Sequence, residues 1–199
     1  MKGAPTWGMI GGLAAAALLW AATLPAAELV IYGFEGSPQG WVIPEWARAS
    51  PDHVAERLLV SRGYASEGHE ALEVWAAFPG GRWACAYVER EPEVTDWTPF
   101  GRLGADVYLP AEAPVGLRAR LILTVGPEWR WTEMSRAVPL SPGVWTTLAA
   151  DLTPASADWG ERPDARFRAD VRKVGIRIEA DTAPAYRGPV FIDRVRVAD

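Results

Sequence analysis

The sequence predicts an all-β protein built as a two-sheet antiparallel β-sandwich, and three observations lead to this prediction. The chain has 19 Gly and 17 Pro residues spread along its length, which leave little room for a long helix. Between them lie short runs rich in Val, Ile, Leu, Tyr and Trp. Within these runs apolar and polar residues alternate, which is typical of strands with one buried face.

The expected strands are short apolar runs bounded by turn residues. About nine runs qualify, which favours an antiparallel sandwich or barrel, and they cover residues 29–34, 71–77, 83–89, 103–109, 117–125, 129–135, 145–152, 174–180 and 190–197. Residues 51–60 are the one stretch with a helical pattern; Ser50 is available as its cap, and a single turn is the alternative. Residues 153–169 are expected to form a polar loop.

The first 27 residues have the layout of a secretory signal peptide. Lys2 precedes an uncharged apolar stretch over residues 7–20, and small residues follow up to Ala26 and Ala27. We expect cleavage near these two alanines, which makes the protein secreted, periplasmic or bound to the cell envelope, with no membrane contact after cleavage. The alternative is an uncleaved anchor, because residues 7–27 are just long enough to span a bilayer, which takes about 20 residues.

Residues 28–199 are then expected to form one β-sandwich domain around a single core. Cys85 is the only cysteine, which excludes an intramolecular disulfide, and its apolar neighbours predict a buried structural residue. The formal net charge is −5 and the pI is near 5.2. This charge argues against nucleic acid as a partner, because phosphate binding requires a basic surface.

Alternation divides each expected strand into two faces, because successive side chains of a strand point to opposite sides of a sheet. In residues 103–109, Leu103 and Val107 share one face, whereas Asp106 and Tyr108 lie on the other. The other runs divide in the same way. Each strand therefore has an aliphatic face for the core and a second face of aromatic and charged residues.

The second face supplies the candidate ligand-binding residues, because an exposed aromatic patch requires a partner. A sugar ring has apolar C–H faces edged by hydroxyl groups, so aromatic rings beside guanidinium and carboxylate groups suit a polysaccharide or an oligosaccharide. The candidates are five outward aromatic residues and two arginines among them, namely Trp75, Tyr87, Tyr108, Arg120, Trp129, Trp131 and Arg177. The alternative is that a loop or a helix covers this face. Trp145 is expected to pack, and Trp41 and Trp46 fit either role.

We expect no catalytic residues. Glycoside hydrolysis needs two carboxyl groups, about 5 Å apart for retention or roughly 6.5–9.5 Å for inversion. Four carboxylates share the outer face and suit arginine pairing equally well: Glu73, Glu89, Glu133 and Glu179. His53 and His69 are too few for a histidine-based metal site or triad. Three hypotheses remain: a non-catalytic carbohydrate-binding domain, a small glycoside hydrolase or polysaccharide lyase on the same fold, and a protein–protein assembly domain.

Several short motifs follow one another along the chain. They are YGFEG at 32–36 with QGW at 39–41, SEGHEALEV at 66–74, LGADVYLP at 103–110, PGVWTTL at 142–148 and VFIDRV at 190–195. In this order they resemble the galactose-binding-like jelly-roll carbohydrate-binding modules attached to secreted glycoside hydrolases, over nearly the whole chain after residue 27. The resemblance implies a jelly-roll sandwich that binds polysaccharide, with a glycoside hydrolase on the same glycan as a candidate partner. Arginine replaces the Asn or Gln of many relatives on the binding face, which brings acidic or decorated glycans into consideration.

The same resemblance implies a structural calcium ion that ties together the first strand, the turn before the second strand and the last strand. By position, its ligands would be the side chains of Glu35 and Asp193, together with Glu67 and the backbone oxygens of Gly33 and Glu70. Calcium takes six to eight oxygen ligands and favours carboxylates with carbonyls, which fits this set. The alternative is that the carboxylates pair with arginine or cap turns.

Overall fold

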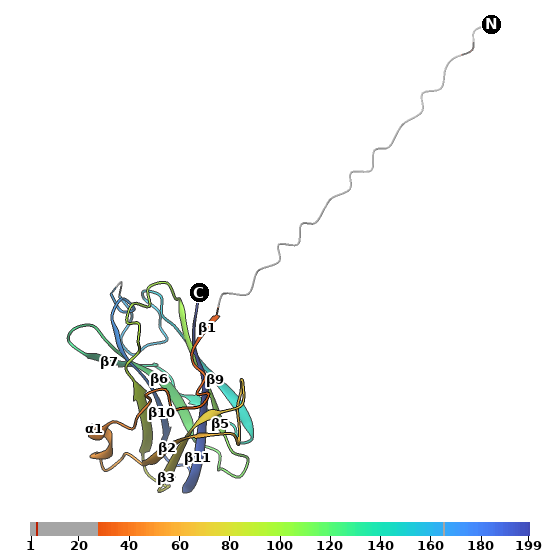
Figure 1. The fold of residues 1–199 in the computed structure, drawn as a ribbon, viewed down its shortest axis with the longest axis vertical. Helices are drawn as coiled ribbons and strands as arrows, with labels where there is room; N and C mark the ends of the chain where they lie inside the picture. Colours follow the sequence, from red (N-terminus) through yellow and green to blue (C-terminus); the bar gives the residue numbers. More distant parts are fainter. Residues whose placement is uncertain (1–2, 4–27, 165) are drawn as a thin grey trace.

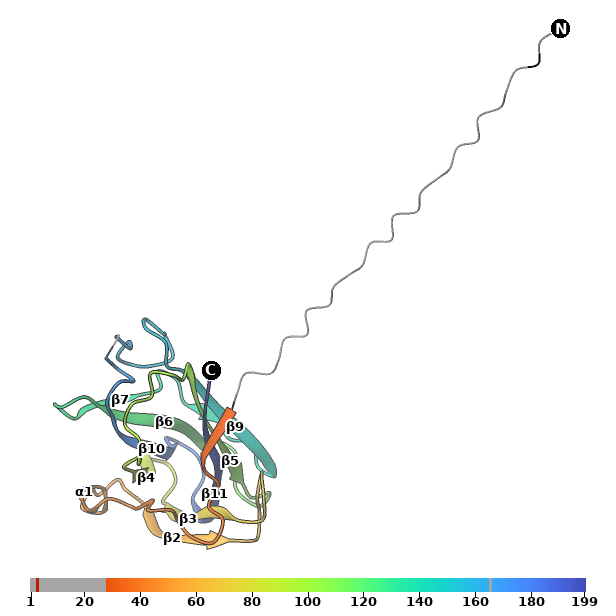
Figure 2. The same ribbon diagram turned by 45° about the horizontal axis from the view of Figure 1, so that its top comes forward.

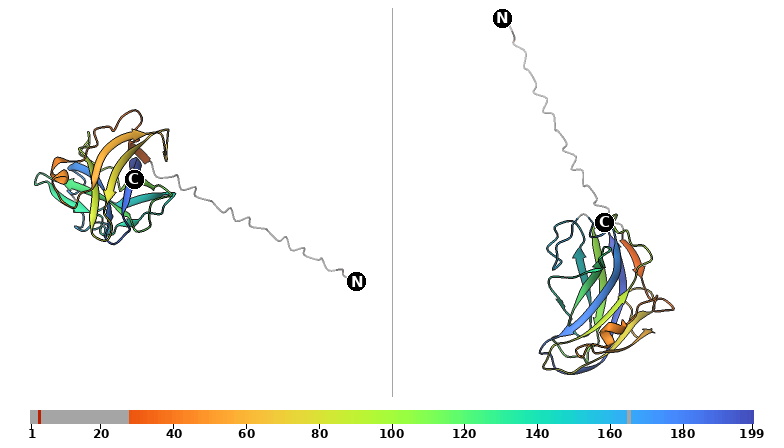
Figure 3. Two further views of the ribbon diagram at one scale, coloured as in Figure 1. Left: turned by 90° about the horizontal axis from the view of Figure 1, so that it is seen from below. Right: turned by 90° about the vertical axis from the view of Figure 1, so that its left-hand side faces the viewer.

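The computed structural model describes Gly3 and residues 28–164 and 166–199 of the 199-residue chain. From residue 28 onward the chain forms two antiparallel sheets that pack against each other, with one short helix (Figures 1 and 3). The predicted two-sheet antiparallel β-sandwich is therefore confirmed. The predicted signal peptide, apart from Gly3, lies outside the described residues. Among the residues that are described, there is no helix with the length and apolar character needed to cross a membrane.

One sheet has six strands in the order β2-β3-β11-β5-β9, and β1 pairs with β11. The strands are β1 (Glu28–Tyr32), β2 (Ala55–Ser61), β3 (Ala71–Phe78), β5 (Arg102–Leu109), β9 (Val144–Asp151) and β11 (Tyr186–Ala198). The long strand β11 pairs with β3 along its first half and with β1 along its second half. Glu28 consequently lies opposite Ala198, and the C-terminus sits beside the start of β1 (Figure 1).

The other sheet has five strands in the order β4-β10-β6-β7, and β8 pairs with β6. The strands are β4 (Ala84–Arg90), β6 (Arg118–Val125), β7 (Arg130–Glu133), β8 (Val138–Pro139) and β10 (Val171–Ala180). The helix α1 (Glu45–Arg48) lies beside β4 (Figure 2). Its Ala47 packs with Tyr87 of β4 and Ile122 of β6, so α1 sits on the outer face of this sheet.

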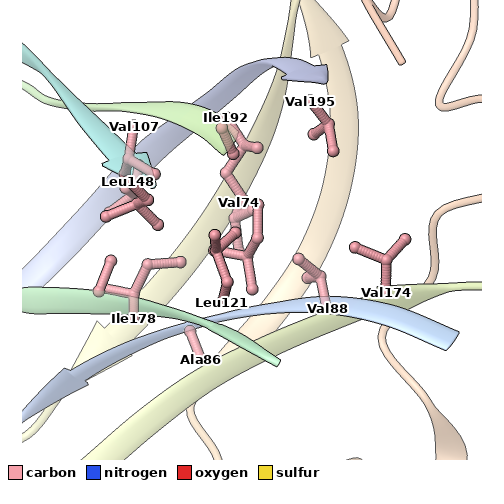
Figure 4. Close-up of a cluster of buried hydrophobic side chains, with 14 of the residues drawn as sticks. Val74, Ala86, Val88, Val107, Leu121, Leu148, Val174, Ile178, Ile192 and Val195 are labelled. Carbon is pink, nitrogen blue, oxygen red and sulfur yellow. The ribbon is translucent and has the colours of Figure 1, made fainter. Parts of the chain in front are cut away.

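The core lies between the two sheets and is formed by the aliphatic faces that alternation predicts. Val74 and Ile192 of the six-stranded sheet point toward Leu121 and Ile178 of the five-stranded sheet (Figure 4), and all four are fully buried. Burying each such side chain contributes about 1.5–3 kcal/mol. Because the inner faces are filled by these residues, the aromatic and charged residues that alternate with them stand on the outer faces.

The helical interpretation of residues 51–60 is wrong. Residues 55–61 form the edge strand β2, which pairs with β3 from Ala55 to Ser61. Leu58 packs partly against the core, and hydrogen bonding to β3 satisfies the backbone, so the sheet overrides the helix preference of Ala, Glu, Arg and Leu. The one helix among the described residues comes earlier, at α1, directly after Pro44.

Two smaller predictions are confirmed. Cys85 is a buried free cysteine, and burial raises the pKa of its thiol to about 11. The described residues between 153 and 169 contain no strand and form a loop. This loop is nevertheless anchored, because Trp159 and Phe167 are buried in the core.

Candidate functional site

Three exposed tryptophans lie close together on the outer face of the five-stranded sheet. Trp46 of α1, Trp129 of the β6–β7 turn and Trp131 of β7 have 54%, 49% and 39% of their surface exposed. The rings of Trp46 and Trp131 lie 5.9 Å apart and nearly perpendicular to each other. Three separate segments therefore bring indole rings to one place, where their faces are open to solvent.

Trp129 has a φ of 55°, in the left-handed region that bulky residues rarely adopt. It follows Gly126, which is also left-handed, and its backbone N–H donates to the Gly126 carbonyl to close the turn. The indole lies about 5.7 Å from the ammonium group of Lys173 and 5.6 Å from the guanidinium group of Arg172. Strained backbone conformations of this kind are concentrated at functional sites, which favours a functional role for Trp129.

Tyr87 lies beneath the tryptophans and is 2% exposed. Its ring centre is 5.4 Å from Trp46 and 5.2 Å from Trp131. Gly175 on β10 makes room for this ring, because a Cβ at that position would lie 2.4 Å from the Tyr87 hydroxyl oxygen. The prediction that Tyr87 stands exposed to ligand is therefore wrong: it is placed in the site, where it supports the two indoles from below.

A hollow of about 490 Å³ opens beside these rings, and we call it the Trp129 hollow. It is lined by Trp46, Trp129, Trp131, Glu89, Thr124 and Lys173. On its polar side, Lys173 Nζ lies 2.5 Å from Glu89 Oε1, and the Tyr87 hydroxyl donates to Glu89 Oε2 at 2.9 Å. The hollow thus combines apolar ring faces with the Lys173 ammonium, the Glu89 carboxylate and the Thr124 hydroxyl group. Ligand sites commonly have this mixture of apolar walls and a few placed polar groups.

A network of ion pairs covers the rest of this face. The buried carboxylate of Glu179 accepts hydrogen bonds from Arg118, Arg120 and Arg177 at 2.8–2.9 Å. Glu133 pairs with the last two of these arginines at 3.1 and 2.8 Å. Burial by itself raises the pKa of Glu179, but the hydrogen bonds from the arginines leave that pKa below its ordinary value. The predicted ligand residues Arg120 and Arg177 therefore lie on the same face, with both guanidinium groups already paired, and neither lines the Trp129 hollow.

The structure does not bring all the predicted aromatic residues together. Trp75 and Tyr108 lie on strands β3 and β5 of the six-stranded sheet, so the prediction of one shared face is wrong for them. The guanidinium of Arg57 covers Trp75 at 4.5 Å. Tyr108 is buried and stacks on Tyr64 with 4.3 Å between ring centres. Alternation separates inward from outward residues but cannot tell which of two sheets an outward residue belongs to.

Trp145 also lies on the six-stranded sheet. It is partly buried and packs against Tyr108, with 5.4 Å between ring centres, as its predicted packing role requires.

Two residues of the Trp129 hollow were not predicted as ligand-binding: the sequence analysis missed Lys173 and left the role of Trp46 open. Lys173 lies on the same face of β10 as Gly175 and Arg177, so extending the expected strand at 174–180 by one residue would have found it. Trp46 carries no such signal, because it sits on a short helix outside the strand pattern.

The predicted calcium ligands fall into two separate groups. Glu35 Oε1 accepts hydrogen bonds from the backbone N–H groups of His69 and Glu70 at 2.7 and 3.1 Å. Asp193 is fully buried and accepts from the backbone N–H groups of Ser66 and Glu67 at 2.7 and 3.0 Å. These bonds join the same three segments that calcium is expected to join.

The donor set does not fit calcium as a single centre. Glu67 pairs with Arg194 at 3.3 Å, and the Glu70 carboxylate accepts from Arg62 and from the Gly36 N–H. Within residues 28–164 and 166–199, no three acidic, histidine or cysteine side chains are grouped so that they could hold a metal ion. The carboxylates are instead satisfied by N–H donors. Calcium binding is therefore implied by the motif resemblance alone, and these contacts do not favour it.

Comparison with solved structures identifies the fold. A structure of carbohydrate-binding modules from the β-sandwich superfamily, described for promiscuous specificity, matches with 13% identity and a TM-score of 0.55, over 82% of this chain and 59% of that one. A module specific for non-crystalline cellulose matches with 16% identity and a TM-score of 0.60, over 85% and 94%. The chain has the β-sandwich fold of carbohydrate-binding modules.

A third structure with this fold is a family 11 module from Clostridium thermocellum in complex with a β-1,3-1,4-mixed-linked tetrasaccharide. It shares 11% identity with this chain and matches with a TM-score of 0.54, over 85% of this chain and 94% of that one. No protein-family model matches the sequence, and no curated protein does. The carbohydrate-binding-module fold thus rests on the arrangement of the two sheets rather than on sequence similarity.

Proposed function

We propose that this protein binds a polysaccharide or an oligosaccharide without catalysis, through the outer face of its five-stranded sheet. One observation carries the proposal: three exposed tryptophans from separate segments surround the Trp129 hollow beside the Glu89–Lys173 pair. A sugar ring can stack its C–H face on an indole while its hydroxyl groups bond to the ammonium, carboxylate and Thr124 hydroxyl groups. Solved structures of the same fold include a module specific for non-crystalline cellulose and one in complex with a β-1,3-1,4-mixed-linked tetrasaccharide, so β-linked polysaccharides are the first ligands to test.

The charges of the site favour binding over hydrolysis or elimination. A general acid needs a raised pKa, whereas hydrogen bonds from the arginines lower the pKa of Glu179. Glu89 is engaged with Lys173 and with the Tyr87 hydroxyl, and burial raises the pKa of Tyr87, which makes that phenol a poor base. These contacts weigh against the glycoside hydrolase and polysaccharide lyase alternatives. The protein assembly alternative would use the same tryptophans against a protein partner.

Affinity gel electrophoresis on a panel of soluble polysaccharides tests the proposal. We expect at least one polysaccharide to retard the protein, and Trp131→Ala or Trp129→Ala to weaken the retardation about tenfold or more, since a buried aromatic contact contributes about 1.5–3 kcal/mol. Trp75→Ala, on the opposite sheet, is the matched control and should bind as the wild type does. Unchanged mobility on every gel would refute the proposal. Release of reducing ends or unsaturated products from a retained polysaccharide would favour an enzyme.

The location of the protein and its partner are part of the proposal. The expected signal peptide places residues 28–199 outside the cytoplasm, secreted or in the periplasm or cell envelope, where polysaccharides occur. A glycoside hydrolase acting on the same glycan is the partner that such a domain would serve. N-terminal sequencing of the protein from the culture medium or envelope fraction checks the cleavage, which we expect next to Ala26 or Ala27.

A further inference from the structure

A second hollow, of about 220 Å³, lies on the same face and shares two walls with the first. We call it the Trp83 hollow; its lining includes Trp83, His53, Cys85 and Arg177 as well as Trp46 and Trp131. The last two residues also line the Trp129 hollow. The paired indoles of Trp46 and Trp131 therefore stand between two neighbouring hollows, and each hollow has one further tryptophan of its own.

The two hollows follow each other along strand β4. Cys85 and Tyr87 line the Trp83 hollow, and Glu89, two residues further along the strand, lines the Trp129 hollow. A strand rises about 3.4 Å per residue, so Cys85 and Glu89 are about 14 Å apart along β4. Trp83 extends this line by two more residues and is 40% exposed. The combined length of the two hollows along β4 suits several consecutive sugar rings. A single terminal sugar would fill only one hollow.

The Trp83 hollow has polar groups of its own. His53 Nε2 lies 3.0 Å from the Tyr87 backbone nitrogen and 3.2 Å from the Tyr87 carbonyl oxygen, and burial lowers the pKa of His53. Arg177 also lines this hollow; it donates to Glu179 and pairs with Glu133, each at 2.8 Å. A neutral imidazole and a fixed guanidinium group thus flank this hollow, whereas an ammonium–carboxylate pair lines the other one.

We propose that the Trp83 and Trp129 hollows are consecutive subsites for one linear oligosaccharide, which runs along β4 and crosses the indoles of Trp46 and Trp131. This inference rests on the proposed carbohydrate binding and adds to it: the ligand is an internal stretch of a chain, and Trp83 sets the minimum length for full affinity. Because the two subsites differ in their polar groups, the chain binds in one direction only.

Isothermal titration calorimetry on a size series tests this proposal. The probe is the polysaccharide that most retards the wild-type protein on the gels, hydrolysed and separated into fragments of increasing length. For the wild type we expect affinity to rise with length and then to level off. Trp83→Ala should weaken binding of the long fragments about tenfold and leave that of the short fragments unchanged, because a lost ring contact of about 1.4 kcal/mol is tenfold in affinity. Trp129→Ala should weaken binding of all lengths.

Trp83→Phe, which retains an aromatic ring, should recover part of the affinity for long fragments, whereas a purely structural defect would not depend on fragment length. If Trp83→Ala binds long fragments as the wild type does while Trp129→Ala does not, the second subsite is refuted and the proposed function stands. If affinity is already maximal for the shortest fragment, the extended site is likewise refuted. If no polysaccharide retards the wild type, the proposed function and this inference fail together.

Discussion

Glu179 has an unusual environment for an acidic residue on the outer face of a sheet. Its carboxylate is buried and accepts hydrogen bonds from three arginines, and its pKa lies below the ordinary value. An acidic group with a lowered pKa stabilises the fold above its unfolded-state pKa, and this stabilisation is lost as the pH falls through the lowered value. Glu179 should therefore contribute fully to stability at neutral pH.

Replacing this carboxylate gives a test at the residue scale. We expect Glu179→Gln to destabilise the protein by about 3–5 kcal/mol at pH 7, because it leaves partly buried guanidinium groups without their shared acceptor. The difference from the wild type should begin to shrink as the pH falls below the ordinary glutamate pKa of 4.5, and should shrink further through the lowered folded-state pKa, where the wild-type carboxyl also takes up a proton. Urea denaturation at pH 7 and pH 3 measures both effects.

Glu161→Gln is the control, because its pair with Arg130 is exposed and should contribute less than about 1 kcal/mol. An equal loss of unfolding free energy in the two variants would mean that burial does not distinguish these ion pairs.

The sequence places these charges on the outer face, since alternation predicts that Glu179 and Arg177 share a side. It cannot predict the pairing, because the partners on β6 and β7 are set by strand order and register.

At the scale of elements, two carboxylates fix the loop that leads into β3. Glu35 accepts hydrogen bonds from backbone N–H groups at 69 and 70, and Asp193 accepts them from those at 66 and 67. The loop that leads into β3 is therefore tied both to the turn after β1 and to β11. Ser66 adds to this, since its hydroxyl group lies 3.2 Å from both Asp106 and Asp193.

These contacts lead to a prediction about metal removal. Because N–H donors already satisfy the carboxylates of Glu35 and Asp193, we expect a chelator to leave the melting temperature unchanged, and added calcium not to raise it. Differential scanning calorimetry with chelator and with calcium checks this, with magnesium as the control cation. A rise in melting temperature that is specific for calcium and reversed by the chelator would contradict this expectation and restore the ligand set implied by the sequence motifs.

The sequence predicts the buried face best for strands in which apolar and polar residues alternate, such as β5 and β10. The inward residues of these two strands are fully buried. Strand β2 was not predicted, because Ala55 to Arg57 favour a helix in isolation and only pairing with β3 makes the segment a strand. Helix α1 was missed for the opposite reason: four residues are too few for a helical period to appear in the sequence.

At the scale of the whole molecule, the proposed binding face is balanced in charge although the chain carries a formal net charge of −5. Arg118, Arg120, Arg177 and Lys173 are each paired with acidic partners, namely Glu89, Glu133, Glu179 and Asp181. The arginines that brought acidic glycans into consideration are therefore engaged within the protein. Neutral glycans suit such a face better than polyanions do.

A change of salt concentration tests this balance. We expect the affinity for the retained polysaccharide to change by less than about twofold between low and high salt, because paired charges leave little long-range attraction to be screened. Titration calorimetry at two sodium chloride concentrations measures it, and a polyuronate should bind no better than a neutral glycan. Affinity that falls steeply with salt, or a preference for the polyuronate, would show that the arginines act on an anionic ligand.

The topology decides which outward residues meet, and this is where sequence reasoning reaches its limit. Trp75 and Tyr87 have the same outward parity, yet β3 and β4 belong to different sheets, so the two rings stand on opposite sides of the molecule. The predicted site contained residues from both sheets. Strand order, which depends on contacts between distant parts of the chain, separates them.

The pairing of Glu28 with Ala198 has a practical consequence for the use of this domain. Residue 28 and the C-terminal end of β11 lie side by side in the six-stranded sheet. The exposed tryptophans of the candidate site, Trp46, Trp129 and Trp131, lie on the outer face of the other sheet. A tag, a solid support or a second domain joined at either end would therefore attach at the same place. In both orientations the fused protein would present its indole rings away from the sheet that carries the attachment.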